Sequence, residues 1–353
     1  MGYQATLAVA RQCPQSLIVI ASRTDPHDAA TTINRMLKQD NVKYMALDLG
    51  FLANVRKFVK KWKEEVHLPI RALVLNAAIQ FPRDIKYSTD GMEMSFAVNH
   101  VGHALLTHLL LGEMDRKARI VVVASSVSGY SSQSSHATLP PLIIRAPIST
   151  QSHAATNQKK CEPQSDPFGS QVHDPAQNWG LKPHYTTASE AAFPSRASLE
   201  AFSGQDRYAT SKLANVLWTK ALARHMGWCP SHASKTVVAL DPGLMPGTGM
   251  LRNASPVFAW LVVHVAPYLV WLLRLVMHPN VQTPRDSGES LAWLATSEEV
   301  AMMGCSGAYF EQRGVREVGA AARVEATQEE LWEWTVERIA ETPEQRQTFE
   351  KLA

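Results

Sequence analysis

The sequence carries little excess charge, few cysteines and no uninterrupted apolar run of membrane-spanning length. Its 353 residues include 35 Lys and Arg against 32 Asp and Glu, a net charge of +3, which is too small and too dispersed to indicate a nucleic-acid partner. The N-terminus lacks the basic and apolar segments of a secretory signal, which favours a cytoplasmic protein in a reducing compartment. Neither a disulfide framework nor a zinc site is predicted, because four cysteines stand without a C-x-x-C pair: Cys13, Cys161, Cys229 and Cys305.

One long apolar stretch, PVFAWLVVHVAPYLVWLL at 256–273, is followed by Arg274. It is slightly short for a spanning helix of about 20 residues, and His264 and Pro267 interrupt it. We interpret 256–276 as a flap over an apolar pocket or as a peripheral membrane contact, with a true span as the third alternative.

Buried strands alternate with amphipathic helices between residues 16 and 126. Apolar runs predict strands at 16–21, 43–49, 70–77 and 118–125, and helical patterns lie near 28–39, 51–66 and 92–112. A further helix follows at 207–226, and further strands at 236–243 and 306–311. Such alternation predicts an α/β fold with a doubly wound parallel sheet covered on both faces. Sheets of this kind bind ligands at the carboxyl ends of their strands.

The pattern predicts a single domain over 1–353 with two additions. Residues 131–205 are rich in Ser, Gln, Pro and His and have little apolar periodicity, which predicts a low-complexity surface insertion. Its histidines lack the short spacing of a metal site, so no metal is expected. The second addition, 316–353, is predicted as a C-terminal helical tail, in which Thr327 and Glu330 form a capping box before LWEWTVERIA.

The clearest candidate for chemistry is the pair Tyr208 and Lys212 in the helix at 207–226. Four residues apart on a helix, the two side chains share one face. A phenol with a pKa near ~10 is a poor proton donor or acceptor at neutral pH. An adjacent lysine ammonium stabilises the phenolate and brings that pKa closer to the working range. Alone, a Y-x-x-x-K pair is a weak signal, because it recurs by chance on many surface helices.

Other candidates stand at strand ends, in turns or inside an apolar helix: Asn76, Asn99, Ser125, Ser126, Pro242, Gly243 and Thr248. Taken singly, each has an ordinary structural explanation, such as a strand cap, a satisfied core amide or a turn. Their order along the chain, together with the tyrosine and lysine pair, is the informative feature.

This order of motifs resembles the short-chain dehydrogenase/reductase family. LVLNAAIQ resembles the N-N-A-G segment of that family, with Ala78 in place of Gly, and VVVASS resembles its serine strand. DGMEMSFAVNHVGHALL, YATSK and LDPGLMPGTG resemble its Asn-bearing helix, its Tyr/Lys helix and its Pro-Gly turn. The combination is most similar to the branch of protochlorophyllide reductases and retinol-dehydrogenase-like enzymes. The resemblance covers roughly residues 2–130 and 206–315.

The resemblance implies a Rossmann-like fold and a catalytic role for four matching residues. Tyr208 would exchange a proton with the substrate oxygen, and Lys212 would lower the pKa of Tyr208 and hold the nicotinamide ribose. Ser126, with Ser125 as the alternative, would position the substrate carbonyl. Asn99 would hold a water that relays protons to Lys212.

The same resemblance implies contacts with a nicotinamide cofactor along the carboxyl edge of the sheet. These contacts are Asp48 and Leu49 at the adenine, Asn76 and Ala77 at the adenine ribose, and Pro242, Gly243 and Thr248 toward the nicotinamide. Family members often pair through the helices that carry their Asn and Tyr/Lys residues, so the resemblance also implies a homodimer.

The strand at 16–21 ends in Ala21-Ser22-Arg23 and carries no acid at the position where a carboxylate would bind a ribose 2′-hydroxyl. Arg23 can instead pair with a 2′-phosphate through charge-assisted hydrogen bonds. The residues therefore favour NADP(H), and Asp25, two residues further on, is the feature that speaks against it.

The sequence departs from the family at its start. A helix at 4–12 leads directly into the strand at 16–21, and only Gly2 matches the T-G-x-x-x-G-x-G loop that receives the pyrophosphate in the family. The first strand lies in the middle of the sheet in the family, so we expect exposed hydrogen-bonding edges there. Either residues that precede Met1 supply this part, or the chain is a truncated relative that binds cofactor poorly.

Two functions follow from these observations. The first is an NADP(H)-dependent oxidoreductase that interconverts a carbonyl and an alcohol, or reduces a carbon–carbon double bond, on a lipophilic small molecule. The alternative is a non-catalytic relative that binds a membrane surface or a protein partner.

Overall fold

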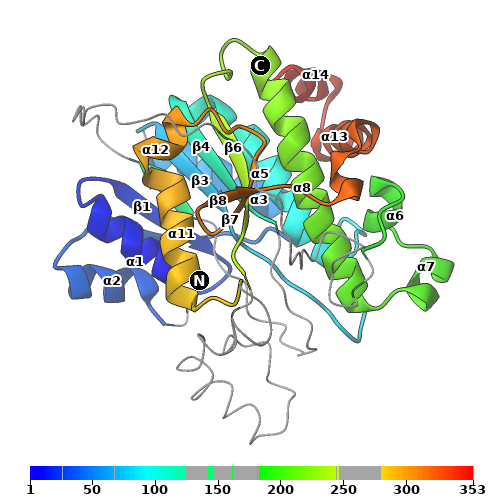
Figure 1. Cartoon of the computed structure of the whole chain (residues 1–353), viewed down its shortest axis with the longest axis horizontal. Helices are drawn as coiled ribbons and strands as arrows, with labels where there is room; N and C mark the ends of the chain where they lie inside the picture. The colour runs from blue at the N-terminus through cyan, green and yellow to red at the C-terminus, as the bar shows by residue number, and fades with distance from the viewer. Residues whose placement is uncertain are drawn as a thin grey trace, which may run out of the picture.

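The fold is built on one mostly parallel sheet (Figure 1). The computed structural model describes residues 1–25, 27–66, 68–124, 142–145, 161, 181, 183–243, 245 and 280–352. The strands of the sheet lie in the order β2-β1-β5-β3-β4-β6-β7-β8. Neighbours are parallel except where β5 pairs with β1 and β3 and where β8 pairs with β7. The strands are β1 (Leu17–Ser22), β2 (Val42–Ala46), β3 (Ile70–Leu75), β4 (Met114–Val123), β5 (Leu142–Arg145), β6 (Thr236–Asp241), β7 (Tyr309–Glu311) and β8 (Gly314–Arg316).

Helices cover both faces of this sheet, which confirms the predicted doubly wound α/β fold (Figure 1). One face carries α1 (Gly2–Gln12), α2 (Ala29–Leu37) and α11 (Pro284–Thr296), whose apolar side chains form one buried cluster with the sheet. The other face carries α3 (Leu52–Glu65), the continuous α4 (Met94–Phe96), η1 (Ala97–Val101) and α5 (Gly102–Leu110), and α8 (Gly204–Trp228). Shorter helices are η2 (Leu111–Glu113), α6 (Ala188–Ala192), α7 (Arg196–Ala201), α12 (Glu298–Met302) and η5 (Ala320–Arg323).

Each strand predicted from an apolar run is present, because the side chains on both faces of such a strand are covered by helices. The runs at 16–21, 43–49, 70–77 and 118–125 correspond to β1, β2, β3 and β4, and those at 236–243 and 306–311 to β6 and β7. In the centre of the sheet, β4 keeps an unbroken parallel register with β6, from Arg119 opposite Thr236 to Val123 opposite Leu240.

Strand β5 corrects two expectations about the sheet. The place between β1 and β3, which we expected to lie open, is filled by β5 in antiparallel orientation. This strand belongs to the segment that we predicted as a surface insertion, yet Leu142, Ile143 and Ile144 are buried. The insertion therefore supplies part of the core, because its short apolar run satisfies the hydrogen-bonding edges of two neighbouring strands.

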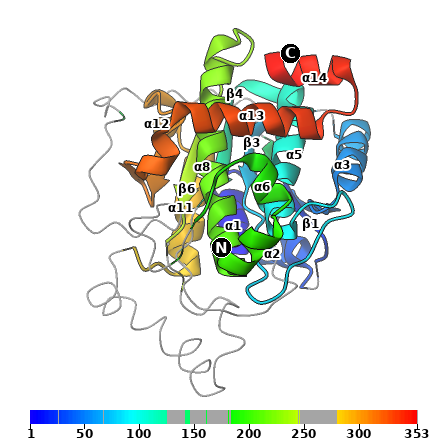
Figure 2. The same cartoon turned by 90° about the vertical axis from the view of Figure 1, so that its right-hand side faces the viewer.

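The C-terminal segment also belongs to the core and is not an appended tail. Helix α13 (Glu325–Ile339) lies across α8 and α5, and α14 (Pro343–Lys351) packs beside it (Figure 2). Leu331, Trp332 and Val336 of α13 are buried in the same cluster as the inner faces of α5 and α8. These helices occupy the surface through which the resemblance predicted pairing of two chains, so a homodimer formed there would require α13 to move.

A disulfide joins Cys161 to Cys305 across 144 residues of sequence, which contradicts the expectation that the cysteines stay unpaired. Widely spaced cysteines gave no sign of this pairing, because the fold alone brings the inserted segment beside the residues before β7. Cys13 and Cys229 are free.

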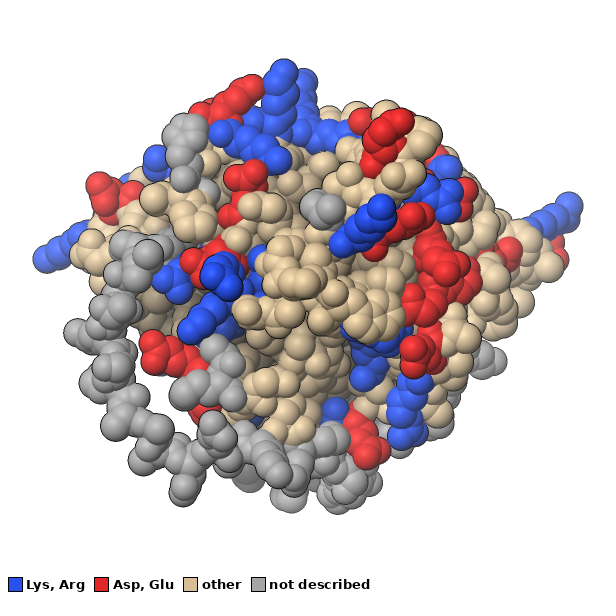
Figure 3. Space-filling view, turned by 90° about the horizontal axis from the view of Figure 1, so that it is seen from above, with Lys and Arg blue, Asp and Glu red and all other residues tan. Residues whose placement is uncertain are grey.

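The charge distribution on the surface and the length of the helices concern the predictions about nucleic-acid and membrane partners. Basic and acidic side chains are both spread over the face seen in Figure 3, in keeping with the balanced composition. Within the described ranges, every helix is too short or too polar to cross a bilayer. The apolar segment 256–276 lies outside the residues that the structure describes.

Candidate active site

Helix α8 positions the tyrosine and lysine pair. It begins with a capping box in which Ser203 and Asp206 each bind the other's backbone N–H. Gly204 lies so close to the Phe81 carbonyl that a Cβ at this position would be 1.7 Å from its oxygen, so the start of the helix is held against the loop after β3. From this start, Tyr208 and Lys212 face the sheet, with only 6% and 1% of their surface exposed.

The ammonium of Lys212 lies at the carboxyl end of β4. Its Nζ donates a hydrogen bond to the carbonyl oxygen of Val123 at 3.0 Å, and Nδ2 of Asn215 donates to the same oxygen at 3.2 Å. Nζ is also 5.6 Å from the centre of the Tyr208 ring. The pair thus stands at the end of the strand that leads toward Ser126, and both serine candidates lie outside the described residues.

Burial changes the proton affinity of Lys212. Removal from water lowers its pKa to about 7, and the nearby charge of Asp241 acts in the opposite direction. A lysine that titrates near neutrality can hold or release a proton at working pH, which an exposed lysine cannot do.

Asn99 connects three elements of the site through its side chain. Its Oδ1 accepts from the Ile79 backbone N–H at 2.8 Å, and its Nδ2 donates to the Ile79 carbonyl at 3.0 Å and to Ser211 Oγ at 2.9 Å. The residue is fully buried within the π-helical turn η1. The amide therefore joins the loop after β3 to α8, and a role in holding a water remains a prediction.

His103 is a member of this site that the sequence did not single out, although it stands four residues after Asn99. Its Nδ1 is 3.0 Å from the Asn99 carbonyl oxygen and must donate the proton, so Nε2 carries the lone pair. Burial and the charge of Lys212 lower the pKa of His103 to about 4. The imidazole is therefore neutral at physiological pH.

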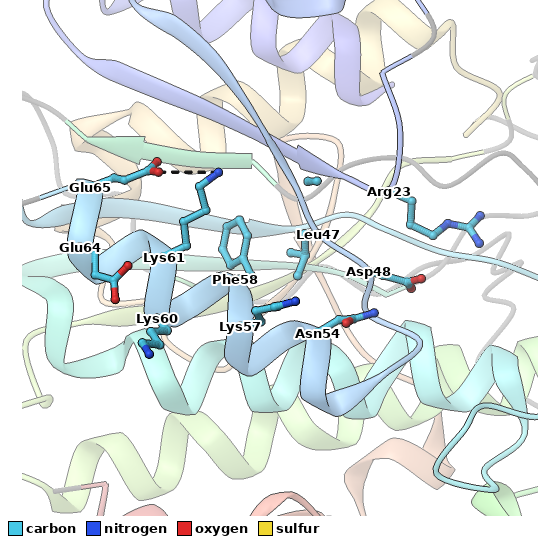
Figure 4. Close-up of a pocket in the computed structure, with 11 residues that line it drawn as sticks. Arg23, Leu47, Asp48, Asn54, Lys57, Phe58, Lys60, Lys61, Glu64 and Glu65 are labelled. Carbon is cyan, nitrogen blue, oxygen red and sulfur yellow. Dashed lines mark ion pairs between the residues drawn. The ribbon is translucent and has the colours of Figure 1, made fainter.

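The adenine candidates lie at the carboxyl ends of β1, β2 and β3. Arg23 and Asp48 line a pocket of about 660 Å³ at the ends of β1 and β2, in front of α3. Asn54 and Lys57, which sequence reasoning missed, extend from α3 into the same end of this pocket, away from the Lys61 and Glu65 ion pair (Figure 4).

Three further candidates are buried and are not among the residues that line this pocket: Leu49, Asn76 and Ala77. Asn76 and Ala77 directly follow β3, so the structure brings them to the same sheet edge as Arg23 and Asp48.

Asp25, the acid whose position near Arg23 disfavours a 2′-phosphate, accepts a hydrogen bond at the start of α2. Both of its carboxylate oxygens are 2.9 Å from the Ala29 backbone nitrogen. Its charge thus serves the N-terminus of that helix, where an anion is favoured.

The Pro-Gly turn follows β6 at the same sheet edge. Gly243 has φ of +77°, and a Cβ there would be 2.5 Å from the Asn280 carbonyl oxygen, so the turn requires glycine. Ser287 Oγ donates to the Pro242 carbonyl at 2.6 Å. Asp241, another residue that sequence reasoning missed, accepts from the Gly243 backbone N–H at 2.9 Å and from the Tyr309 hydroxyl at 3.1 Å. Thr248 lies outside the described residues.

Comparisons with known proteins show what the chain is similar to. Residues 1–137 match the family model for short chain dehydrogenases. The chain is 28% identical over 298 residues to a short-chain dehydrogenase, iccH, of Talaromyces variabilis, covering 82% of this chain and 76% of that protein. It is also 28% identical over 290 residues to retinol dehydrogenase 14 of Homo sapiens, covering 81% of this chain and 63% of that protein. The chain thus spans less than two thirds of the length of the retinol dehydrogenase.

A solved structure shares the fold. An uncharacterized protein from Mycobacterium paratuberculosis superimposes with a TM-score of 0.51 at 18% sequence identity, over 96% of this chain and 90% of that one.

Proposed function

The chain belongs to the short-chain dehydrogenase/reductase family, and from this premise we propose that it is an NADP(H)-dependent oxidoreductase acting on a lipophilic small molecule. The reaction interconverts a carbonyl and an alcohol, with reduction of a carbon–carbon double bond as the variant. One observation carries the proposal: Tyr208 and Lys212 are buried together at the carboxyl edge of the sheet, with Nζ of Lys212 3.0 Å from the last carbonyl of β4.

Each candidate residue at this edge of the sheet has a separate role in the proposed reaction. Tyr208 gives its hydroxyl proton to the substrate oxygen during reduction and takes it back during oxidation. Lys212 stabilises the phenolate that remains and would donate hydrogen bonds to the nicotinamide ribose of a bound cofactor. Ser126 holds the substrate carbonyl, and Asn99 keeps α8 and the loop after β3 in register. NADPH supplies the hydride when it is bound.

Several residues at this sheet edge support the choice of a dinucleotide with a 2′-phosphate. The pocket at the ends of β1 and β2 is lined by Arg23, Asp48 and Lys57, among others. Arg23 and Lys57 would bind the 2′-phosphate, and Asp48 and Leu49 would contact the adenine. Asn76 and Ala77, which follow β3, would contact the adenine ribose, and Pro242 and Gly243 would contact the nicotinamide end. Asp25 is engaged by the start of α2, which supports the choice of Arg23 and a 2′-phosphate over a ribose 2′-hydroxyl bound by Asp25.

Two considerations support a lipophilic substrate. A relative that covers most of this chain is named for retinol, an apolar alcohol. The apolar residues 256–276 follow the Pro-Gly turn that ends at the site. We propose that this segment covers the substrate or meets a membrane surface.

The test is NADPH consumption with a panel of lipophilic aldehydes and ketones, retinal among them. Tyr208→Phe should lower turnover by about 100-fold or more, because the proton donor is lost, while the circular dichroism spectrum stays unchanged. Tyr87→Phe is the matched control, since Tyr87 is exposed and outside the site. Full activity of Tyr208→Phe would refute the assignment.

A further inference from the structure

Asp241 is a buried carboxylate at the end of β6 that none of the roles above uses. Only 2% of its surface is exposed. Its Oδ1 accepts from the Gly243 backbone N–H and its Oδ2 from the Tyr309 hydroxyl, at 2.9 and 3.1 Å. A carboxylate in such a place is costly unless charge or hydrogen bonds compensate for the lost water.

The strand pattern directs Asp241 toward Lys212. Along β6, Val237 and Ala239 pack into the cluster under α8, whereas Val238 and Leu240 pack into the opposite cluster. Side chains alternate along a strand, so Asp241 faces the α8 side.

The register brings the two charges together. Nζ of Lys212 is hydrogen-bonded to the Val123 carbonyl, and Val123 pairs with Leu240, the residue before Asp241. Neighbouring strands are about 4.8 Å apart. The ammonium and the carboxylate therefore occupy adjacent strand ends on one face of the sheet.

We propose that Asp241 is the counter-charge of Lys212, a positioning residue that keeps the buried ammonium protonated where Tyr208 reacts. Among the residues that the structure describes, the titratable groups near Lys212 come from three elements: Tyr208 from α8, His103 from α5 and Asp241 from β6. His103 is neutral and cannot balance the ammonium. The charge of Asp241 raises the pKa of Lys212 against the effect of burial, which agrees with this geometry.

Tyr309 extends the arrangement to β7. Its hydroxyl holds Oδ2 of Asp241 from the strand that pairs with β6. Strand β4 thus contributes a carbonyl that accepts from Lys212, β6 contributes the carboxylate, and β7 contributes the hydroxyl that holds this carboxylate. The consequence for turnover rests on the proposed function, whereas the charge pairing itself does not.

The pairing can be measured without cofactor or substrate. Protein with ¹³C-labelled lysine is titrated between pH 5 and pH 9 by NMR, and Lys212 is assigned by its absence in Lys212→Met. The midpoint of the wild-type signal should lie at about 7. Asp241→Asn keeps the size and the acceptor for Gly243 but removes the charge, so the midpoint should fall by about one pH unit.

Tyr309→Phe is the matched control, because it removes one hydrogen bond and leaves the charge. Its midpoint should stay within a few tenths of a pH unit of the wild type. If Asp241 served only the turn, Asp241→Asn would leave the Lys212 midpoint unchanged, and that result would overturn the inference.

A second arm applies if Asp241→Asn alone does not fold. The double variant Asp241→Asn with Lys212→Met should then fold, because it leaves no unbalanced charge. Failure of the double variant to fold would refute the pairing. It would show that the Asp241 carboxylate is needed for the turn after β6 even when the Lys212 charge is absent.

Turnover gives a separate readout. At pH 7 the protonated fraction of Lys212 should fall from about one half to about one tenth in Asp241→Asn, and the rate should fall about fivefold. Wild-type protein that consumes no NADPH would refute the proposed function while the NMR titration still decides the charge pairing.

Discussion

Replacing Ile143 by alanine tests whether the inserted segment supplies the middle of the sheet. Ile143 has no exposed surface, and its backbone lies opposite Val19 of β1 and Leu73 of β3. The substitution removes three carbon atoms from the cluster under α8, a transfer loss of about 2.5 kcal/mol at about 0.8 kcal/mol per methylene. The cavity left between the sheet and the helices that cover it raises the expected loss to about 3–4 kcal/mol.

Urea unfolding followed by circular dichroism measures this loss. The midpoint should fall while the slope of the free energy of unfolding against urea stays constant, because the surface exposed on unfolding is unchanged. Met36→Ala is the control: Met36 lies on α2 with 54% of its surface exposed, and the change should stay within about 0.5 kcal/mol. A loss below about 1 kcal/mol for Ile143→Ala would refute the place of β5 in the sheet.

Three further predictions follow from the described residues. Cys305→Ser should lower the free energy of unfolding by up to about 5 kcal/mol, because it opens a disulfide-closed loop of 144 residues. A reducing agent should lower the urea midpoint of the wild type and leave that of the variant unchanged. Arg23→Ala should raise the KM for NADPH about tenfold or more and leave that for NADH nearly unchanged, because only NADPH carries the phosphate; an equal effect on both cofactors would contradict the role of Arg23. The free energy of unfolding should fall as the pH drops below 6.5, because burial lowers the pKa values of His100, His103 and His108 to about 3, 4 and 3. In this range the unfolded chain binds protons that the folded chain excludes, so the free energy of unfolding should fall by up to about 4 kcal/mol per pH unit for the three histidines. His108→Phe should remove about a third of that slope.

The local patterns were sufficient to predict the parallel part of the fold. Continuous apolar runs mark buried strands, and the spacing of Tyr208 and Lys212 places both on one helical face whatever the rest of the chain does. Their position at the end of β4 follows from the fold class, because strand ends meet at one edge of a parallel sheet.

The features that the sequence did not predict depend on contacts between distant residues. The run LIIR of β5 is short and stands among polar residues, and nothing local indicates that it pairs between β1 and β3 in antiparallel orientation. The disulfide joins two residues 144 apart. Asp241 and His103 acquire a role only through the charge of Lys212, which lies on another element.

Cofactor binding by the whole chain tests the central claim most directly. NADPH is titrated into the protein, and energy transfer from its tryptophans to the reduced nicotinamide is recorded, with NADH as the comparison. The proposed function predicts saturable transfer at micromolar NADPH and at least about tenfold weaker binding of NADH. Folded protein that shows no transfer with either cofactor would contradict an NADP(H)-dependent oxidoreductase.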